Sequence, residues 1–124
     1  MGRWLIWAGL NGLIAVAAGA FGAHALQATL EPKALGWIET ASRYELAHAL
    51  ALLWVAVLAR DDVSPWIARA GWLFAAGTVL FCGSLYALAF TGMRPFAWVT
   101  PLGGLAFLAG WAALIAAGLA SKRR

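Results

Sequence analysis

One short stretch of the chain, together with a histidine that precedes it, holds the side chains whose types and spacing could support chemistry. The candidate set is His24, Glu39, Arg43, Tyr44, Glu45 and His48. On a helix, Glu39 and Arg43 lie on one face, one turn apart, in the acid-before-base order that favours an ion pair. Tyr44 and His48 share another face, and Glu45 lies beside His48. Groups of this kind could anchor the chain at an interface, contact an anion or relay a proton.

Metal binding and covalent catalysis fit this pattern less well. Glu45 and His48 form Glu-x-x-His, but di-iron helix bundles use two copies of that motif with further glutamates. A site made of His24, Glu45 and His48 stays open as the signature of a metal-dependent membrane enzyme. Ser42 and Ser84 lack the motif of an activated nucleophile. We therefore expect no catalytic residues, no bound metal and no cofactor, and hence a protein that is not an enzyme.

The composition defines the environment of these groups. Of the 124 residues, 64% are hydrophobic and 11% are charged. Soluble domains carry about 25% charged and 45–50% apolar residues, and a small globule cannot hide so much apolar surface. Cys82 is the only cysteine, so a disulfide within the chain is excluded. These numbers exclude a soluble domain, a disordered chain and a disulfide-rich secreted module, and they indicate a membrane protein.

The net charge of +4 does not indicate a nucleic-acid-binding protein. Proteins of that class cluster basic residues along one face. Here the basic residues stand at the ends of apolar runs, and Lys122, Arg123 and Arg124 form a short tail. This placement is typical of basic residues that flank membrane spans and face anionic lipid. The expected partner is therefore the lipid bilayer, and nucleic acid is excluded.

Four apolar runs define the elements that must position the candidate set. A helix needs about 20 residues to cross the hydrocarbon core of a bilayer. The uncharged runs Trp4–Ala23, Ala70–Thr91 and Pro101–Ser121 meet that length, whereas Leu46–Ala59 is too short. The short run can cross only if it takes in the polar residues before it. A crossing at this point therefore carries the candidate set into the membrane.

The sequence thus predicts an all-α fold, a four-helix transmembrane bundle that forms one integral membrane domain over residues 1–124. The expected helices are 4–26, 37–59, 65–91 and 101–120. Ser64-Pro65 and Thr100-Pro101 each predict a helix start, because a hydroxyl residue caps a helix and proline suits its first position. Glu31-Pro32 is an alternative start for the second helix, which would then protrude, tilt or break near Gly36.

The distribution of basic residues predicts the orientation of the bundle. With four spans, six basic residues fall on one side: Arg3, Arg60, Arg69, Lys122, Arg123 and Arg124. Three fall on the other: Lys33, Arg43 and Arg94. Because cytoplasmic loops carry the excess of Lys and Arg, we expect both termini in the cytoplasm. The first apolar run, which ends at Ala23-His24-Ala25, loosely mimics a signal peptide, but it is longer than such peptides usually are.

Small residues recur four positions apart on the first and last predicted helices. The rows are Ala15, Gly19 and Ala23 on the first helix, with Ala109, Ala113 and Ala117, and Ala106 and Gly110, on the last. Such rows let helix backbones approach closely in lipid. They predict either packing within the bundle or the contact surface of a homo-oligomer.

Several short motifs run in order along nearly the whole chain. They are Gly19-Ala20-Phe21-Gly22-Ala23-His24, Arg43-Tyr44, His48-Ala49-Leu50-Ala51-Leu52, Phe81, Gly83-Ser84-Leu85-Tyr86, Thr100-Pro101-Leu102-Gly103-Gly104 and Gly110-Trp111. On these residues the chain resembles the family of bacterial inner-membrane YgdD proteins and animal transmembrane protein 256, a domain of unknown function. Cys82 stands where many relatives are expected to carry serine. The resemblance implies a four-helix integral membrane protein and brings no activity, substrate or cofactor with it.

The function that the sequence favours is an interaction or assembly role in a bacterial cell inner membrane. The small-residue rows support it, and the expected partner is a homo-oligomer or another membrane protein. The alternative is a small transporter, channel or proton-coupled device whose polar path is lined by the candidate set. A metal-dependent membrane enzyme is the third alternative.

Overall fold

The computed structural model describes residues 2–61 and 64–123, which form helices joined by turns and contain no strand. The elements are α1 (Gly2–Ala23), the 3₁₀ turn η1 (Ala25–Ala28), α2 (Pro32–Asp61), α3 (Pro65–Gly77), the π-helical segment η2 (Thr78–Cys82), α4 (Gly83–Thr91) and α5 (Pro95–Lys122). Four helical stretches are long and apolar enough to cross a membrane, with α3, η2 and α4 counted as one. The predicted all-α, four-helix transmembrane architecture is confirmed.

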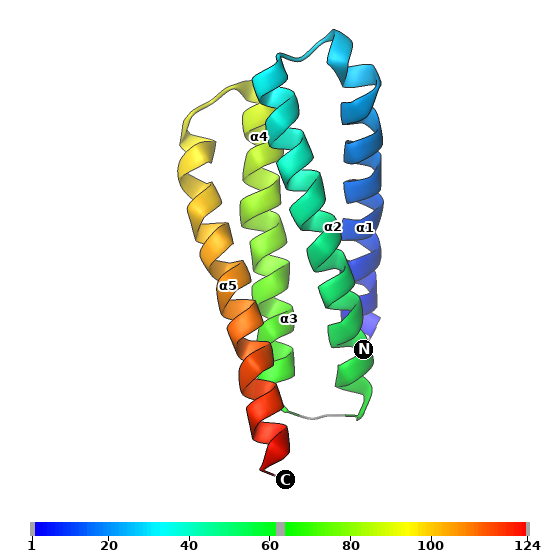
Figure 1. Ribbon diagram of the computed structural model, residues 1–124, viewed down its shortest axis with the longest axis vertical. Helices are drawn as coiled ribbons and strands as arrows, with labels where there is room; N and C mark the ends of the chain where they lie inside the picture. The colour runs from blue at the N-terminus through cyan, green and yellow to red at the C-terminus, as the bar shows by residue number, and fades with distance from the viewer. Residues whose placement is uncertain (1, 62–63, 124) are drawn as a thin grey trace.

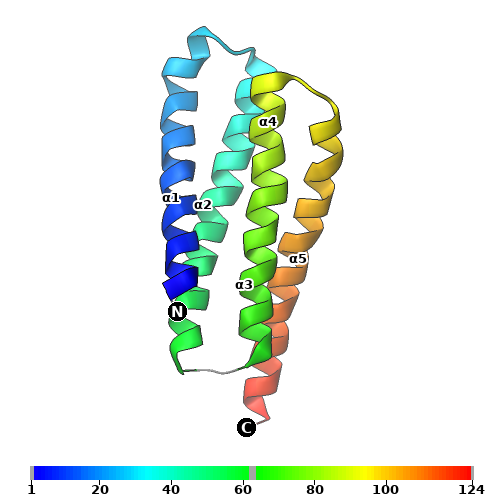
Figure 2. The ribbon, with the colours of Figure 1, turned by 180° about the vertical axis from the view of Figure 1, so that it is seen from behind.

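The four long helices run up and down side by side, so that both chain ends lie at the same end of the bundle (Figure 1). Helix α1 packs mainly on α2, and α3 packs mainly on α5. Helix α2 also contacts the rod formed by α3, η2 and α4. Helices α1 and α5 therefore lie at opposite edges of the bundle, as the view from behind also shows (Figure 2). The polar helix α2 occupies an inner position.

Proline and glycine define most helix boundaries. Pro32, Pro65 and Pro95 are the first residues of their helices, where the missing N–H of proline removes no helical hydrogen bond. At the other end of α4, Gly92 adopts a left-handed conformation with φ of 68° and donates its N–H to Leu88 O at 2.8 Å. The predicted helix start at Ser64-Pro65 is confirmed.

Three predicted boundaries differ from the structure by three residues or more. The last helix begins at Pro95, and Pro101 lies inside it. The reason is that a membrane helix tolerates an internal proline. The ring removes only the hydrogen bond from position 101 to Ala97 O, and the residues on both sides of it stay helical. The first helix ends at Ala23 rather than at residue 26. Helix α2 starts at the alternative position and continues through Gly36 to Asp61.

Aromatic rings pack directly against glycines where α5 contacts the rod formed by α3, η2 and α4. A Cβ atom added to Gly77 would collide with the Phe107 ring, and one added to Gly110 would collide with the Phe74 ring. At Gly103 the added atom would meet the backbone of Phe81. Because only glycine leaves this space, these positions let the two elements approach closely.

The small-residue rows divide between the inside and the outside of the bundle. On α1, Ala15 is buried, and the Ser42 hydroxyl of α2 donates to its carbonyl at 2.7 Å. On α5, Gly110, Ala113 and Ala117 are buried, whereas Ala109 is exposed. The packing interpretation therefore holds for these buried residues, whereas Ala23 of α1 and Ala109 of α5 remain exposed for another contact.

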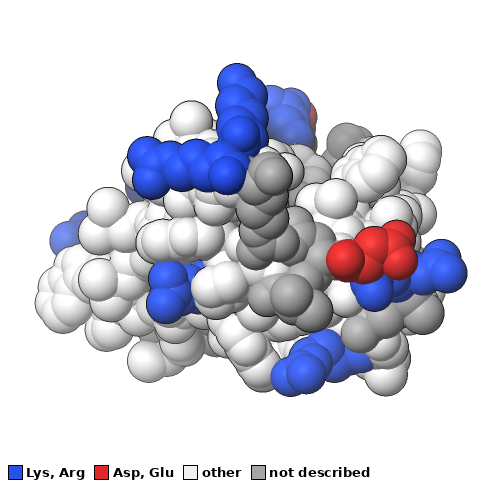
Figure 3. Space-filling model, turned by 90° about the horizontal axis from the view of Figure 1, so that it is seen from below, with Lys and Arg blue, Asp and Glu red and all other residues white. Residues whose placement is uncertain are grey.

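Lys and Arg side chains gather at the end of the bundle that holds both termini (Figure 3). Helix boundaries place Arg3, Arg60, Arg69, Lys122 and Arg123 there. Tryptophan rings accompany the basic residues at both ends. Arg69 lies 4.5 Å from the ring centre of Trp66, and Lys33 lies 5.4 Å from that of Trp37. Paired aromatic and basic side chains of this kind suit the boundary between lipid and water.

Gly103→Ala tests the close approach of α5 to η2. We expect this substitution to lower the free energy of unfolding in detergent by at least about 2 kcal/mol, because overpacking a close contact is destabilising and the contacted atoms belong to backbone. Gly104→Ala is the matched control, since its Cβ would lie 3.9 Å from the nearest atom, in Phe81. Equal stability of the two variants in thermal unfolding would contradict this packing.

Candidate functional site

The structure spreads the predicted candidate residues over three faces of α2 and one turn. Glu39 and Arg43 form the outermost group. Arg43 Nη2 lies 2.8 Å from Glu39 Oε1, and the two side chains are 74% and 71% exposed. The predicted ion pair is present, near the bundle end opposite the termini. Exposed ion pairs contribute only about 0–1 kcal/mol to folding stability. This pair is therefore better suited to placing charged groups at the boundary between lipid and water than to stabilising the bundle.

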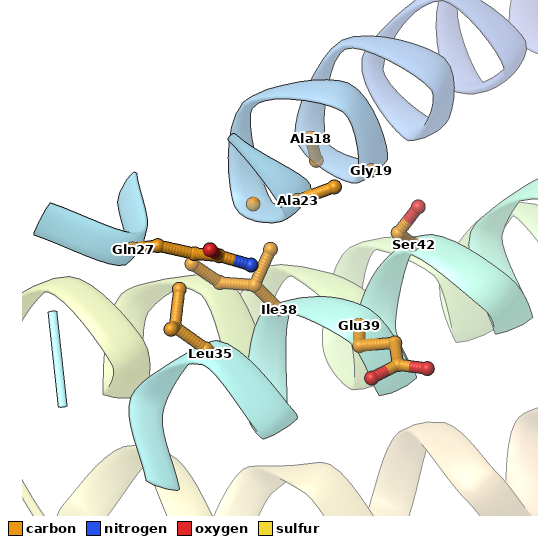
Figure 4. Close-up of a pocket in the computed structure, with 9 residues that line it drawn as sticks. Ala18, Gly19, Ala23, Gln27, Leu35, Ile38, Glu39 and Ser42 are labelled. Carbon is orange, nitrogen blue, oxygen red and sulfur yellow. The ribbon is translucent and has the colours of Figure 1, made fainter. Parts of the chain in front are cut away.

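His24 lies apart from the residues of α2. It is exposed in the turn between α1 and η1. A pocket of about 440 Å³ lies near it, between the end of α1 and the start of α2, and Gln27, Glu39 and Ser42 are its polar lining residues. Figure 4 shows that the Glu39 carboxylate turns away from α1. His24 does not line this pocket, so the structure does not join it to the other candidates.

His48 is buried on the face of α2 that looks toward α5. Its Nδ1 lies 2.7 Å from Tyr44 O, and Trp111 Nε1 donates to its Nε2 at 3.1 Å. A carbonyl oxygen only accepts, so Nδ1 carries the hydrogen, and Nε2 offers its lone pair to the indole. The imidazole is therefore a neutral ring held in one tautomer. It also stacks on Phe107, with ring centres 3.6 Å apart.

An aromatic groove opens around this histidine between α2 and α5. It has a volume of about 560 Å³, and its lining includes Tyr44, Phe81 and Trp111. The Tyr44 ring lies 4.8 Å from the Phe81 ring, centre to centre. Segments that are far apart in the sequence thus meet at His48. The sequence singled out Tyr44 and His48, but it did not identify Trp111 as the hydrogen-bond donor, because that contact joins residues 63 positions apart.

Glu45 occupies a third face of α2 and is only 4% exposed. The Tyr86 hydroxyl of α4 donates to its Oε1 at 2.8 Å. A pocket of about 290 Å³ surrounds the carboxyl between α1, α2 and the rod, and Asn11 and Thr78 also line it. Asn11, Glu45 and Thr78 lie close to the midpoints of their membrane-spanning helices. The structure therefore places a buried carboxyl near the midpoint of a membrane-spanning helix, with Tyr86 as its hydrogen-bond partner.

The π-helical segment η2 contacts both of these regions. It turns Phe81 toward the aromatic groove and Thr78 toward the Glu45 pocket. Just after it, Ser84 Oγ bonds Phe81 O at 2.9 Å and Thr100 Oγ1 of α5 at 2.6 Å. Ser84 therefore links the start of α4 to α5. Segments of π-helix are uncommon and occur frequently at functional sites, which makes this level of the bundle the best candidate region.

The candidate metal site is not assembled. Glu45 and His48 look toward different helices, and His24 lies near the far end of the bundle. Within residues 2–61 and 64–123, no group of three His, Cys, Asp or Glu side chains is placed to hold a metal ion. The arrangement instead supports non-covalent binding, through the neutral His48 ring on one side of α2 and the Glu45 carboxyl on another.

Comparisons with known proteins agree over most of the chain. A family model described as "Protein of unknown function (DUF423)" matches residues 18–104. The inner membrane protein YgdD of Escherichia coli (strain K12) is 46% identical, with 97% of this chain and 92% of that protein covered. A UPF0382 membrane protein of Haemophilus influenzae is 44% identical, with 97% and 96% covered, and YwdK of Bacillus subtilis is 43% identical, with 92% and 94% covered. No solved structure matches the chain. The predicted family and the multi-pass inner-membrane location are confirmed.

Trp111→Phe tests the hydrogen bond that fixes the His48 ring. We expect a loss of about 1–3 kcal/mol in unfolding free energy, because the buried Nε2 acceptor loses its donor. Trp54→Phe is the control, since Trp54 is 64% exposed on the lipid-facing side of α2. Thermal unfolding in detergent measures both variants. If Trp111→Phe proves no more destabilising than Trp54→Phe, the assigned tautomer and bond are wrong.

Proposed function

The chain belongs to the DUF423 family of membrane proteins, named UPF0382 in its relatives, and from that premise we propose that it is a non-enzymatic protein that works by self-assembly in the membrane. The observation that carries the proposal is an open groove between α3 and α5. It has a volume of about 650 Å³ and is floored by alanines of α5. We expect a transmembrane helix from a second copy of this chain to occupy it.

The groove is lined by small residues, over which a helix backbone can approach closely. Ala109, Ala112 and Ala116 line its α5 side, and Trp66 and Trp72 line its α3 side. In lipid the hydrophobic effect does not drive helices together. Van der Waals packing, which is strongest where small residues let the backbones approach closely, therefore supplies much of the attraction between them. The alanines extend over about two turns of helix, or roughly 11 Å. The row that the sequence singled out is thus only partly used for packing inside the bundle.

The chain itself offers a helix for this groove. Helix α1 packs mainly on α2, and its outward face carries Gly9, around which an added Cβ would find nothing within 4 Å. Leu5 and Leu13 flank Gly9 on the same exposed face. Gly9 and the groove lie in the half of the bundle that holds the termini. A contact from α1 of one copy to the groove of the next joins unlike surfaces, which closes into a ring when the rotation between copies permits.

The division of the polar groups supports a non-enzymatic role. The neutral His48 ring, the exposed Glu39–Arg43 pair and the buried Glu45 carboxyl lie on separate faces of α2. Acid–base catalysis needs the groups that exchange protons within hydrogen-bond reach of one reacting centre. This separation is what an interaction protein with structural polar contacts would have.

We further propose that the end of the bundle with both termini faces the cytoplasm. The excess of Lys and Arg at that end supports this orientation, since cytoplasmic loops of membrane proteins carry more basic residues than the loops on the other side.

Ala112→Leu tests the assembly role. A leucine side chain fills the groove floor, so we expect the dissociation constant of the oligomer to rise by roughly tenfold to a hundredfold, as overpacking by about 1–3 kcal/mol implies. Ala47→Leu is the matched control, because Ala47 is exposed on α2 and outside the groove. Analytical ultracentrifugation in detergent measures the association of both variants.

The parent protein should sediment as one defined oligomer that Ala112→Leu weakens and Ala47→Leu leaves intact. A parent protein that stays monomeric at every concentration, in detergent and in lipid nanodiscs, contradicts self-assembly. If Ala112→Leu and Ala47→Leu change the dissociation constant of the oligomer equally, the interface lies outside this groove.

A further inference from the structure

The pocket around Glu45 holds a carboxyl that has no basic partner within residues 2–61 and 64–123. Among the residues that the structure describes, the one ion pair joins Arg43 to Glu39 near the bundle end. Glu45 receives a single hydrogen bond there, from Tyr86 to Oε1. A buried carboxylate is strongly disfavoured unless a positive charge or further donors accompany it. A bound group that carries a positive charge or hydrogen-bond donors would therefore stabilise the carboxylate in this pocket.

The other polar side chains of the pocket each donate a hydrogen bond within the protein. Asn11 Nδ2 donates to Trp7 O at 2.8 Å, and Thr78 Oγ1 donates to Ala75 O at 2.8 Å. The Tyr86 hydroxyl donates to Glu45. The Asn11 carbonyl, the Thr78 oxygen and the second carboxyl oxygen are left with acceptor capacity. A set of acceptors without free hydroxyl donors favours a cation or a hydrogen-bond donor over an anion.

The way into the pocket leads through lipid. Leu10, Ile14 and Val79 line it and are 50%, 47% and 55% exposed on the outer surface of the bundle. Because the pocket lies near the midpoints of the helices, this surface faces the hydrocarbon core. A compound that reaches Glu45 by this route must dissolve in the membrane, so it needs apolar groups around its charge.

We propose that the pocket binds a lipophilic organic cation, a positive charge carried by aromatic or aliphatic groups. The Glu45 carboxylate pairs with the charge. The Trp7 side chain lines the same pocket, and an indole ring attracts a cation more strongly where water is excluded. The apolar rim holds the remaining groups of the cation. This site is independent of the α3–α5 groove, so either can fail without the other.

Tetraphenylphosphonium and tetraphenylborate are the probes, because both carry four phenyl groups and differ in the sign of the charge. We expect the purified full-length protein in detergent to bind the phosphonium in equilibrium dialysis and not the borate. Glu45→Gln keeps the shape and removes the charge, so it should weaken binding of the phosphonium by roughly thirtyfold or more. Glu39→Gln, which removes an exposed carboxylate on the same helix, should leave binding unchanged.

A second measurement uses the parent protein and does not depend on how the variants fold. Dicyclohexylcarbodiimide dissolves in lipid and adds to protonated carboxyls to give a stable N-acylurea. Peptide mapping by mass spectrometry should find this adduct on Glu45, and tetraphenylphosphonium should suppress it while tetraphenylborate does not. Equal binding of both probes, unchanged binding by a folded Glu45→Gln variant, or labelling of Glu45 that the phosphonium does not reduce would each overturn the proposal.

Discussion

The structure depends on how one polar helix is accommodated in lipid. Helix α2 crosses the membrane although its first half carries charged and hydrogen-bonding side chains. Unsatisfied polar groups are expensive in the hydrocarbon region. Glu45 and His48 are each buried and hydrogen-bonded by a partner from another helix, Tyr86 or Trp111. The charged pair Glu39–Arg43 lies nearer the bundle end, where water is within reach. Each of these groups thus has a hydrogen-bond or ion-pair partner at its own depth.

This requirement determines the shape of the bundle. Helix α2 needs cover on more than one side, so α1 packs on it from one edge while the rod and α5 cover it from the other. Close approach of α5 to the rod depends on glycines that leave space for Phe74, Phe81 and Phe107. Two helices with broad lipid-facing surfaces remain at the edges, α1 and α5. Those surfaces and the cavities beside α2 are where the protein can meet other molecules.

The sequence predicted the features that depend on composition and local spacing, and it missed those that depend on distant contacts. Four spans, the start at Pro65 and the Glu39–Arg43 pair follow from run lengths, caps and helical periodicity. Trp111 and Tyr86 were not identified as partners because nothing local marks which helix faces which. Pro101 was wrongly predicted as a helix start, because no local signal shows that the helix already begins at Pro95 and continues through Pro101. The small-residue rows indicated close packing but not how they divide between inside and outside.

The most direct test is whether α2 crosses the bilayer. In a protein whose Cys82 is replaced by alanine, single cysteines at Lys33 and Asp61 mark the two ends of that helix. A membrane-impermeant maleimide added to intact cells should label the cysteine at position 33, and the one at position 61 only after the membrane is opened. Labelling of both positions from the same side would show that α2 does not span the membrane, and the four-span bundle with a polar helix inside it would be wrong.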